Sequence, residues 1–337
     1  MTDVARFWLG KRPHWITSCA VVMVCVLGLG SRWASGTAPT VSPPAPVAQT
    51  ADELAEIMVE AREPRYVAPT LRDQIGRIWA PVFINGRGPF RLVLDTGASR
   101  SAVTAMVALA LGIPTDQSPP VMLRGVTGSA TVPTIRVETL SVGDVAVDSA
   151  TLPIVPDAMG GAQGVLGSEG LANKRIFIDF HHDQIAISYS RDEKTGSDFV
   201  RVPFSSLRGQ LIVVNAIVGQ VRAKAIIDTG AQTTIANLAL RDALARRNLT
   251  SRGLPDQIIG ATMAIQDGEL ISMPAIELGS IHILSSGVTF SNLVIFKQWK
   301  LLDEPTILIG MDALGLLDTL IIDYRRHELQ MRTLKSG

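Results

Sequence analysis

The strongest constraint on the fold is a tetrapeptide that the sequence contains twice, each time after an apolar run. Residues 95–98 and 228–231 both read Asp-Thr-Gly-Ala, and the two copies are 133 positions apart. Two hydrophobic residues and a glycine follow each copy, at 165–167 and at 308–310. Self-similarity at a nearly constant offset indicates that one structural unit is repeated within the chain. The sequence therefore predicts two similar lobes.

The local pattern within each copy is that of β-structure. In the first copy a short apolar run leads into Asn85-Gly86, a dipeptide typical of two-residue hairpin turns, and in the second a longer run leads into Gly219. Each Asp-Thr-Gly motif is thus expected at the end of the second strand of a hairpin. Helix-like segments follow at 105–111 and 238–247, while most other segments are short and β-branched. Each half is predicted as mostly strand with one or two short helices.

The acidic residues of the two motifs are Asp95 and Asp228. One Asp-Thr-Gly turn alone is weak evidence for chemistry, because Asp and Gly are common in ordinary turns. If two lobes pack about a pseudo-twofold axis, however, equivalent loops meet at that axis and the two carboxylates become neighbours. Such a pair shares a proton, so that one member acts as a base and the other as an acid at the same pH. This combination suits hydrolysis of an amide by an activated water molecule.

The doubled motif resembles that of the retropepsin-like aspartic peptidases, in particular the bacterial exported kind with two lobes in one chain. The likeness covers roughly residues 78–333. It implies an all-β fold of two pseudo-twofold-related acid-protease lobes with short helices, and it implies that Asp95 and Asp228 are catalytic. In such enzymes each motif threonine bonds across to the backbone of the other lobe. The residues that would support the two catalytic loops are Thr96, Gly97, Thr229 and Gly230.

The resemblance also implies flaps that close over an extended peptide. The segments that would form them contain glycines and follow each catalytic motif: Gly125, Val126, Thr127 and Gly128 in the first half, and Gly260, Ala261 and Thr262 in the second. The three tyrosines, Tyr66, Tyr189 and Tyr324, all lie outside these segments. The flap tyrosine of pepsins is therefore missing, which argues for retropepsin-like rather than pepsin-like lobes.

The beginning of the chain has the layout of an export signal. Lys11 and Arg12 precede an uncharged run at 16–30, which as a helix would span about 22 Å, less than the ~30 Å hydrocarbon core of a membrane. A cleaved signal peptide and a retained inner-membrane anchor both remain open, and both predict a periplasmic location for the rest of the chain. The predicted division of the chain is 1–36 as signal or anchor, 37–75 as Pro-rich linker and short helix (51–62), 76–200 as N-terminal lobe and 201–337 as C-terminal lobe.

Composition excludes several other classes. Formal net charge is zero, with 31 basic and 31 acidic residues, and there is no Lys/Arg block that would bind nucleic acid. Both cysteines, Cys19 and Cys25, lie in the apolar run, so the rest of the chain carries no thiol chemistry. His181 and His182 are adjacent and have no third partner at a metal-ligand spacing, which favours a solvated turn. No metal and no cofactor are expected.

The sequence thus predicts a monomeric aspartic endopeptidase that acts on a peptide or protein substrate, with an envelope protein as one candidate, and that contacts a membrane only through its N-terminal segment. The alternative is a peptide-binding or scaffolding module that uses the same fold without catalysis. Asp179 and Asp323 recur at equivalent positions, each after an isoleucine. They are interpreted as structural residues that accept backbone hydrogen bonds at the end of a strand.

Overall fold

The structure is a computed structural model. The structure describes residues 66–69, 76–143, 145–157, 160–191, 193, 195–208, 211–284 and 287–334. The predicted signal or anchor segment, the Pro-rich linker and the helix expected at 51–62 lie outside these residues. Within this part of the chain, no helix combines the length and the apolar character that crossing a membrane requires.

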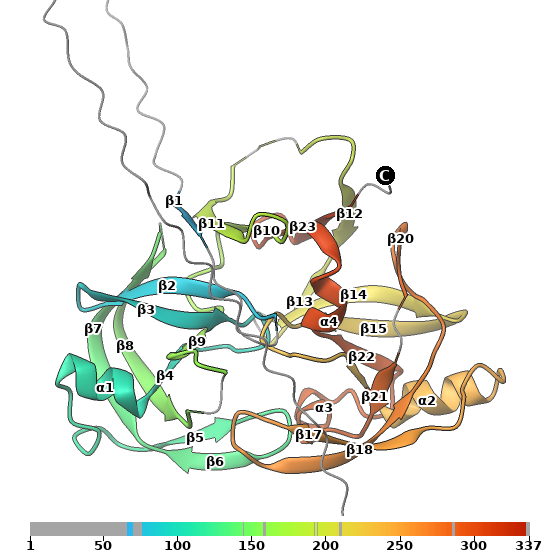
Figure 1. The fold of residues 1–337 in the computed structure, drawn as a ribbon, viewed down its shortest axis with the longest axis horizontal. Coiled ribbons are helices and arrows are strands. Elements are labelled where there is room, and N and C mark those ends of the chain that lie inside the picture. Colours follow the sequence, from blue (N-terminus) through green and yellow to red (C-terminus); the bar gives the residue numbers. More distant parts are fainter. Residues whose placement is uncertain are drawn as a thin grey trace, which may run out of the picture. The chain divides into compact units, whose positions relative to one another are not determined.

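The N-terminal lobe is built around a closed β-barrel (Figure 1). Its strands, in the described ranges, are β2 (Trp79–Ile84), β3 (Arg87–Leu94), β4 (Ala102–Thr104), β7 (Thr134–Val142), β8 (Val145–Val155) and β9 (Gly164–Leu166). The turn between β2 and β3 places Asn85 and Gly86 at φ 50° and 69°, the left-handed backbone that a two-residue hairpin turn requires. Leu92, Leu94 and Ile135 fill the barrel and are almost completely buried. The hairpin that the sequence predicts at Asn85-Gly86 is confirmed.

Two further elements complete this lobe. Helix α1 (Ala105–Leu111) has the bounds that the sequence predicts, and it ends at Gly112, whose φ of 72° lets its N–H reach back to carbonyl groups of the last turn. Strands β5 (Val121–Arg124) and β6 (Ser129–Val132) form a separate two-stranded ribbon. This ribbon projects from the barrel toward the other lobe (Figure 1).

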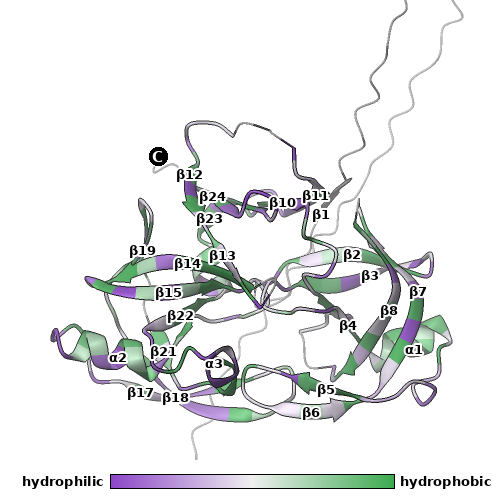
Figure 2. Ribbon diagram, turned by 180° about the vertical axis from the view of Figure 1, so that it is seen from behind, coloured by the Kyte–Doolittle hydropathy of each residue, from purple (hydrophilic) through white to green (hydrophobic). Residues whose placement is uncertain are grey.

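The C-terminal lobe is a ten-stranded sheet that repeats much of the same topology. Its strands among the described residues are β13 (Ser205–Leu207), β14 (Leu211–Val218), β15 (Val221–Ile227), β16 (Ile235–Ala236), β17 (Leu254–Ile259), β18 (Ile265–Ile271), β19 (Ile276–Leu278), β20 (Ile281–Ile283), β21 (Val288–Phe290) and β22 (Thr306–Ile309). Parallel pairing of β15 with β22 matches that of β3 with β9 in the first lobe. Figure 2 shows apolar residues along the central strands of both lobes, which accords with their burial.

Three helices are described in the second half. Helix α2 (Leu238–Ala245) corresponds to the helix predicted at 238–247 and ends two residues earlier; the side chain of Asn237 caps it by accepting the N–H of Leu240 at 2.9 Å. Helices α3 (Val294–Trp299) and α4 (Met311–Leu314) were not foreseen. Both are too short to show a helical period in sequence.

A six-stranded sheet joins the two halves. Its order is β1-β11-β10-β23-β24-β12, with β1 (Tyr66–Pro69), β10 (Lys174–Asp179), β11 (Gln184–Tyr189), β12 (Val200–Pro203), β23 (Leu317–Asp323) and β24 (Glu328–Thr333). We call it the interlobe sheet. Its centre is the antiparallel pairing of β10 with β23, one strand from each half. It lies on one side of the junction between the lobes, whereas β5–β6 and β17–β18 lie on the opposite side (Figure 1).

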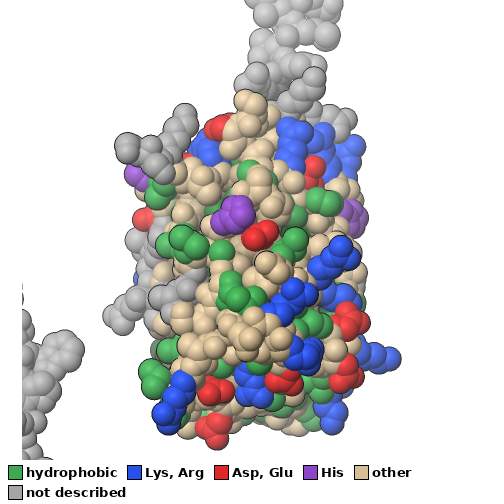
Figure 3. Space-filling model, turned by 90° about the vertical axis from the view of Figure 1, so that its right-hand side faces the viewer, with side chains coloured by type: hydrophobic (Ala, Val, Ile, Leu, Met, Phe, Trp, Pro, Cys, Tyr) green, Lys and Arg blue, Asp and Glu red, His purple; other side chains and the backbone are tan. Residues whose placement is uncertain are grey.

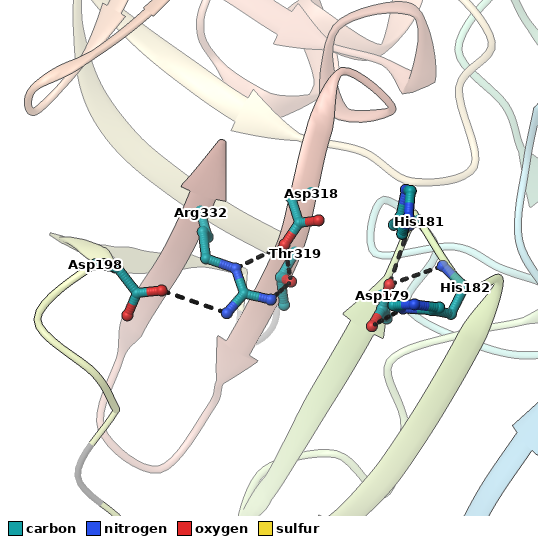
Figure 4. Close-up of polar contacts among 7 residues, drawn as sticks. All are labelled: Asp179, His181, His182, Asp198, Asp318, Thr319 and Arg332. Carbon is teal, nitrogen blue, oxygen red and sulfur yellow. Dashed lines mark hydrogen bonds and ion pairs between the residues drawn. The ribbon is translucent and has the colours of Figure 1, made fainter. Parts of the chain in front are cut away.

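Polar contacts on the interlobe sheet are shown in Figure 4. The guanidinium of Arg332 donates to Asp318 at 2.6 Å and to the hydroxyl of Thr319 at 2.9 Å, and it lies 3.4 Å from the carboxylate of Asp198. Burial alone would raise the pKa of Asp318, but the hydrogen bonds from Arg332 and Thr319 outweigh it and lower that pKa. Arg332 thus connects two adjacent strands of the sheet with the segment that precedes β12.

These observations confirm the predicted fold class. The described residues are mostly β-strand with short helices, and the second lobe repeats part of the strand pairing of the six-stranded barrel in the first. The interlobe sheet contains strands from both sides of the boundary predicted at residue 200, and the division of the chain at that residue stays a prediction.

Candidate active site

The two Asp-Thr-Gly loops follow equivalent strands. Asp95 comes directly after β3 and Asp228 directly after β15, and the backbone N–H of each donates to the strand that runs parallel to it, at 3.0 Å in both lobes. One carboxylate oxygen of Asp95 accepts the N–H groups of Gly97 and Ala98 at 2.8 and 2.9 Å. Asp228 accepts the equivalent two N–H groups in its own loop at 2.9 and 3.1 Å. Each loop therefore fixes the orientation of its carboxylate by local hydrogen bonds.

Two buried threonines link the loops across the lobe boundary. The hydroxyl of Thr96 donates to the carbonyl of Ile227 at 2.7 Å and accepts the N–H of Thr229 at 3.1 Å. The hydroxyl of Thr229 donates to the carbonyl of Leu94 at 2.7 Å and accepts the N–H of Thr96 at 3.2 Å. The exposed fraction is 1% for Thr96 and 0% for Thr229. These are the cross-lobe backbone bonds that the resemblance implies for the motif threonines.

The structure brings the carboxyl groups of Asp95 and Asp228 close together, near enough for each to shift the pKa of the other. The glycine of each motif lies against the carboxyl group of the other lobe: a Cβ atom added to Gly97 would lie 2.6 Å from a carboxylate oxygen of Asp228, and one added to Gly230 would overlap the carboxyl group of Asp95. Only glycine leaves room for the two acids to approach each other at these positions.

The environment separates the acidities of the two groups. Burial of the carboxyl group raises the pKa of Asp228 well above its ordinary value, and the negative charge of Asp95 raises it further. Burial also raises the pKa of Asp95, but the N–H groups of Ala98 and Gly97, the neighbouring carboxyl group of Asp228 and the positive charge of Arg77 oppose that rise. The pKa of Asp228 is therefore raised further than that of Asp95, and the pair is suited to share one proton.

The predicted flap segments meet tip to tip on the other side of the pair. The β5–β6 turn contains Gly125 to Gly128 and the β17–β18 turn contains Gly260 to Thr262. The hydroxyl of Thr127 donates to the carbonyl of Ala264 at 2.7 Å, and the carbonyl of Val126 accepts the N–H of Ile295 in α3 at 3.2 Å. The first ribbon is thereby fastened to the second lobe at two points.

A cleft of about 480 Å³ opens beside the first Asp-Thr-Gly loop. It is lined by Thr96, Gly97 and the residues that follow them, by β5, and by α3 and the β13–β14 region of the second lobe. Most of its walls come from residues that the sequence reasoning did not single out, among them Arg100, Arg124 and Trp299. No motif marks these residues; only the pairing of lobes brings them together.

One further hydrogen bond in each lobe supports the Asp-Thr-Gly loop, and the sequence did not predict it. The hydroxyl of Ser101 accepts the N–H of Gly167 at 3.1 Å, and in the other lobe the hydroxyl of Thr234 accepts the N–H of Gly310 at 3.2 Å. The repeat offset was the signal that could have found this layer, because Ser101 and Thr234 are 133 positions apart like the motif residues.

Asp179 and Asp323, the two acids that recur at equivalent positions, lie on the interlobe sheet. Asp179 accepts the backbone N–H groups of His181 and His182 at 3.0 and 2.9 Å, and its second oxygen contacts the ring of His182 (Figure 4). Asp323 accepts the N–H of Arg326 at 3.0 Å and the hydroxyl of Ser190 at 2.7 Å. The prediction that both acids accept backbone hydrogen bonds at strand ends is confirmed.

Comparison with known proteins agrees with this architecture. Residues 80–169 match the sequence model of a family described as aspartyl protease. The matched segment, which includes Asp95 and nearly all of the barrel, is similar to an aspartyl protease domain. A search of curated proteins finds no match to the chain.

Proposed function

We propose that the protein is an aspartic endopeptidase that hydrolyses peptide bonds of an extended polypeptide. The observation that carries this proposal is the close approach of Asp95 and Asp228, each held in an Asp-Thr-Gly loop by equivalent bonds. The match to the aspartyl protease family supports a peptidase of this type. The pair is the only chemistry that the proposal needs, and neither a metal nor a cofactor takes part in it.

The separated acidities define the roles of the two acids. A water molecule between the carboxyl groups gives one proton to Asp95 while its oxygen attacks the carbonyl carbon of the substrate, and Asp228 gives its proton to the carbonyl oxygen. A tetrahedral diol results. Asp95 then passes its proton to the amide nitrogen, the C–N bond breaks, and a hydroxyl of the diol returns a proton to Asp228. The cycle ends with the same protonation state and without a covalent intermediate.

The flaps define how a substrate would enter. Because Thr127 bonds to the opposite tip and Val126 bonds to α3, the tips must separate before a polypeptide can reach the two acids. An extended chain would then occupy the cleft beside the catalytic loops. Lid opening of this kind occurs on microsecond to millisecond timescales in other enzymes.

The test uses single Asn substitutions in the full chain. Asp95→Asn and Asp228→Asn should each lower kcat against a peptide library by at least about 10²–10⁴-fold, while circular dichroism shows a retained fold. A transition-state mimic with a statine hydroxyl should inhibit the wild type. Peptide binding without turnover, or appreciable activity in either variant, would instead support the non-catalytic module or a different mechanism.

The predicted cellular setting forms part of the proposal. We expect a periplasmic, monomeric enzyme with residues 1–36 as signal or anchor, and with residues 76–200 and 201–337 as its lobes. The doubled motif supports a monomer, because both acids come from one chain. Cell fractionation with N-terminal sequencing of the mature protein would distinguish a cleaved signal from a retained anchor.

A further inference from the structure

Three arginines from separate segments line the cleft beside the first catalytic loop. Arg100 follows the Asp-Thr-Gly-Ala motif, Arg124 ends β5 in the first flap, and Arg208 follows β13 in the second lobe. All three side chains are exposed. The guanidinium of Arg208 donates to the backbone carbonyl of Gln298, another lining residue, which holds it along the wall. Three cations thus converge on one cavity through tertiary structure.

The cleft offers these cations no carboxylate. Its lining residues include no Asp or Glu, and among the described residues neither Arg100, Arg124 nor Arg208 forms an ion pair. Glu169 follows the lining residue Ser168 in the sequence, but it is not part of the lining. Its carboxylate accepts the N–H of Ser101 at 2.6 Å. Elsewhere the charges are mixed: Figure 3 shows acidic and basic side chains interspersed over the face of the C-terminal lobe. The cleft is therefore locally positive, although the formal net charge of the whole chain is zero.

Two of these charges have no counterpart in the other copy of the repeat. Arg100 corresponds to Thr233 in the second copy of the motif. Alignment of Arg124-Gly125-Val126-Thr127 with Ile259-Gly260-Ala261-Thr262 makes Ile259 the counterpart of Arg124. The exposed fraction of Ile259 is 60%. Where the Asp95 side carries a cation, the Asp228 side carries a neutral or an apolar side chain.

We propose that the cleft selects substrates with an acidic side chain on one side of the scissile bond, and that Arg124, Arg208 and Arg100 determine this selectivity. This inference rests on the proposed function, since it names the substrate class of the same site. An aspartate or glutamate of an extended peptide in the cleft meets guanidinium groups that have no counterion of their own. The counterpart of Arg124 in the second copy, Ile259, carries no charge that could bind such a side chain.

The test begins with the full wild-type chain and a positional-scanning peptide library. The best-cleaved peptide is then resynthesised with Glu or with Gln at each position on either side of the scissile bond. The kcat/KM should favour Glu over Gln on one side only, by about two- to fivefold for each arginine engaged. Because exposed charges are screened, this preference should decrease between roughly 0.02 M and roughly 0.5 M salt.

Single substitutions of the arginines show which of them cause the preference for Glu over Gln. Arg124→Gln and Arg208→Gln should each reduce the ratio of kcat/KM for the Glu peptide to kcat/KM for the Gln peptide, and an unchanged ratio would overturn the role of that arginine. Arg124→Glu should favour Lys at the position where the wild type favours Glu. Arg222→Gln is the matched control, because Arg222 is an exposed arginine on strand β15 that does not line the cleft; its ratio should equal that of the wild type.

The outcomes separate the two proposals. Cleavage with equal kcat/KM for Glu and Gln peptides at every position would overturn the acidic selectivity and leave the peptidase proposal standing. Absence of any cleavage would overturn the peptidase proposal; the same fluorescent peptides then report binding by anisotropy. Tighter binding of Glu than of Gln peptides would support the arginine cleft even then, and equal binding would overturn it.

Discussion

Thr96 and Thr229 exchange hydrogen bonds symmetrically: each hydroxyl accepts the backbone N–H of the other, at 3.1 and 3.2 Å, while it donates to a carbonyl of the strand that precedes the other. These bonds are buried and they join segments 133 residues apart. Neither Asp-Thr-Gly loop can therefore shift without breaking bonds to the other. The positions of the two acids are set jointly by both lobes.

Removal of either hydroxyl should weaken this connection. Thr96→Val and Thr229→Val each leave a buried carbonyl and a buried N–H without a partner, so each should lower the free energy of unfolding by about 1–3 kcal/mol. Chemical denaturation measures the loss. Thr96→Ser and Thr229→Ser keep the hydroxyl and should retain most of the stability; equal losses for Ser and Val would mean that the methyl group, not the bond, matters.

The activity should have a bell-shaped pH profile. In the proposed mechanism, turnover requires Asp95 ionised and Asp228 protonated, and the pKa of both groups is raised. In a plot of kcat/KM against pH, the midpoints of both limbs should then lie above pH 3.8. The acidic limb reports the first deprotonation of the pair and the alkaline limb the second. Arg77→Gln removes a positive charge that lowers the pKa of Asp95, so it should move the acidic limb to higher pH. An unmoved acidic limb would contradict this role of Arg77.

The raised pKa of Asp228 also predicts a pH-dependent stability. In the folded state Asp228 binds its proton more tightly than in the unfolded chain, so its contribution to stability is complete below about 3.8 and decreases as the pH rises toward its folded pKa. Asp228→Asn removes this titration. The variant should be more stable than the wild type at neutral pH and similar to it at pH below 3.8, as thermal unfolding across pH would show. A variant that is less stable than the wild type at neutral pH would refute the assignment.

The motif glycines should tolerate no side chain. Gly97→Ala places a methyl group 2.6 Å from a carboxylate oxygen of Asp228, a distance that forces the acids apart. We expect kcat to fall by about 10²-fold or more, with a retained fold by circular dichroism. Gly112→Ala provides a comparison, since a Cβ there meets no atom within 4 Å although its φ is 72°; it should cost stability but not specific activity. Normal turnover by Gly97→Ala would show that the contact is relieved without displacing the acids.

The sequence was informative wherever the repeat or local turn chemistry decided the structure. The turn at Asn85-Gly86, the helix at 105–111 and the proximity of Asp95 and Asp228 all follow from patterns within one copy or from equivalence between copies. The four-residue helix at Met311–Leu314 is too short to show the periodic pattern of apolar residues that predicts a helix. The arginines of the cleft were missed because Arg100, Arg124 and Arg208 are far apart in sequence and meet only after two lobes and a flap have folded together.

The interlobe sheet has one further consequence. Its central ladder pairs β10 of the first half with β23 of the second, and β12, which begins the second half, pairs with the last strand β24. The two acids are thus brought together by intramolecular folding rather than by association of separate molecules. Dilution cannot separate them, and the specific activity should stay constant down to the lowest concentrations at which the folded chain can be assayed.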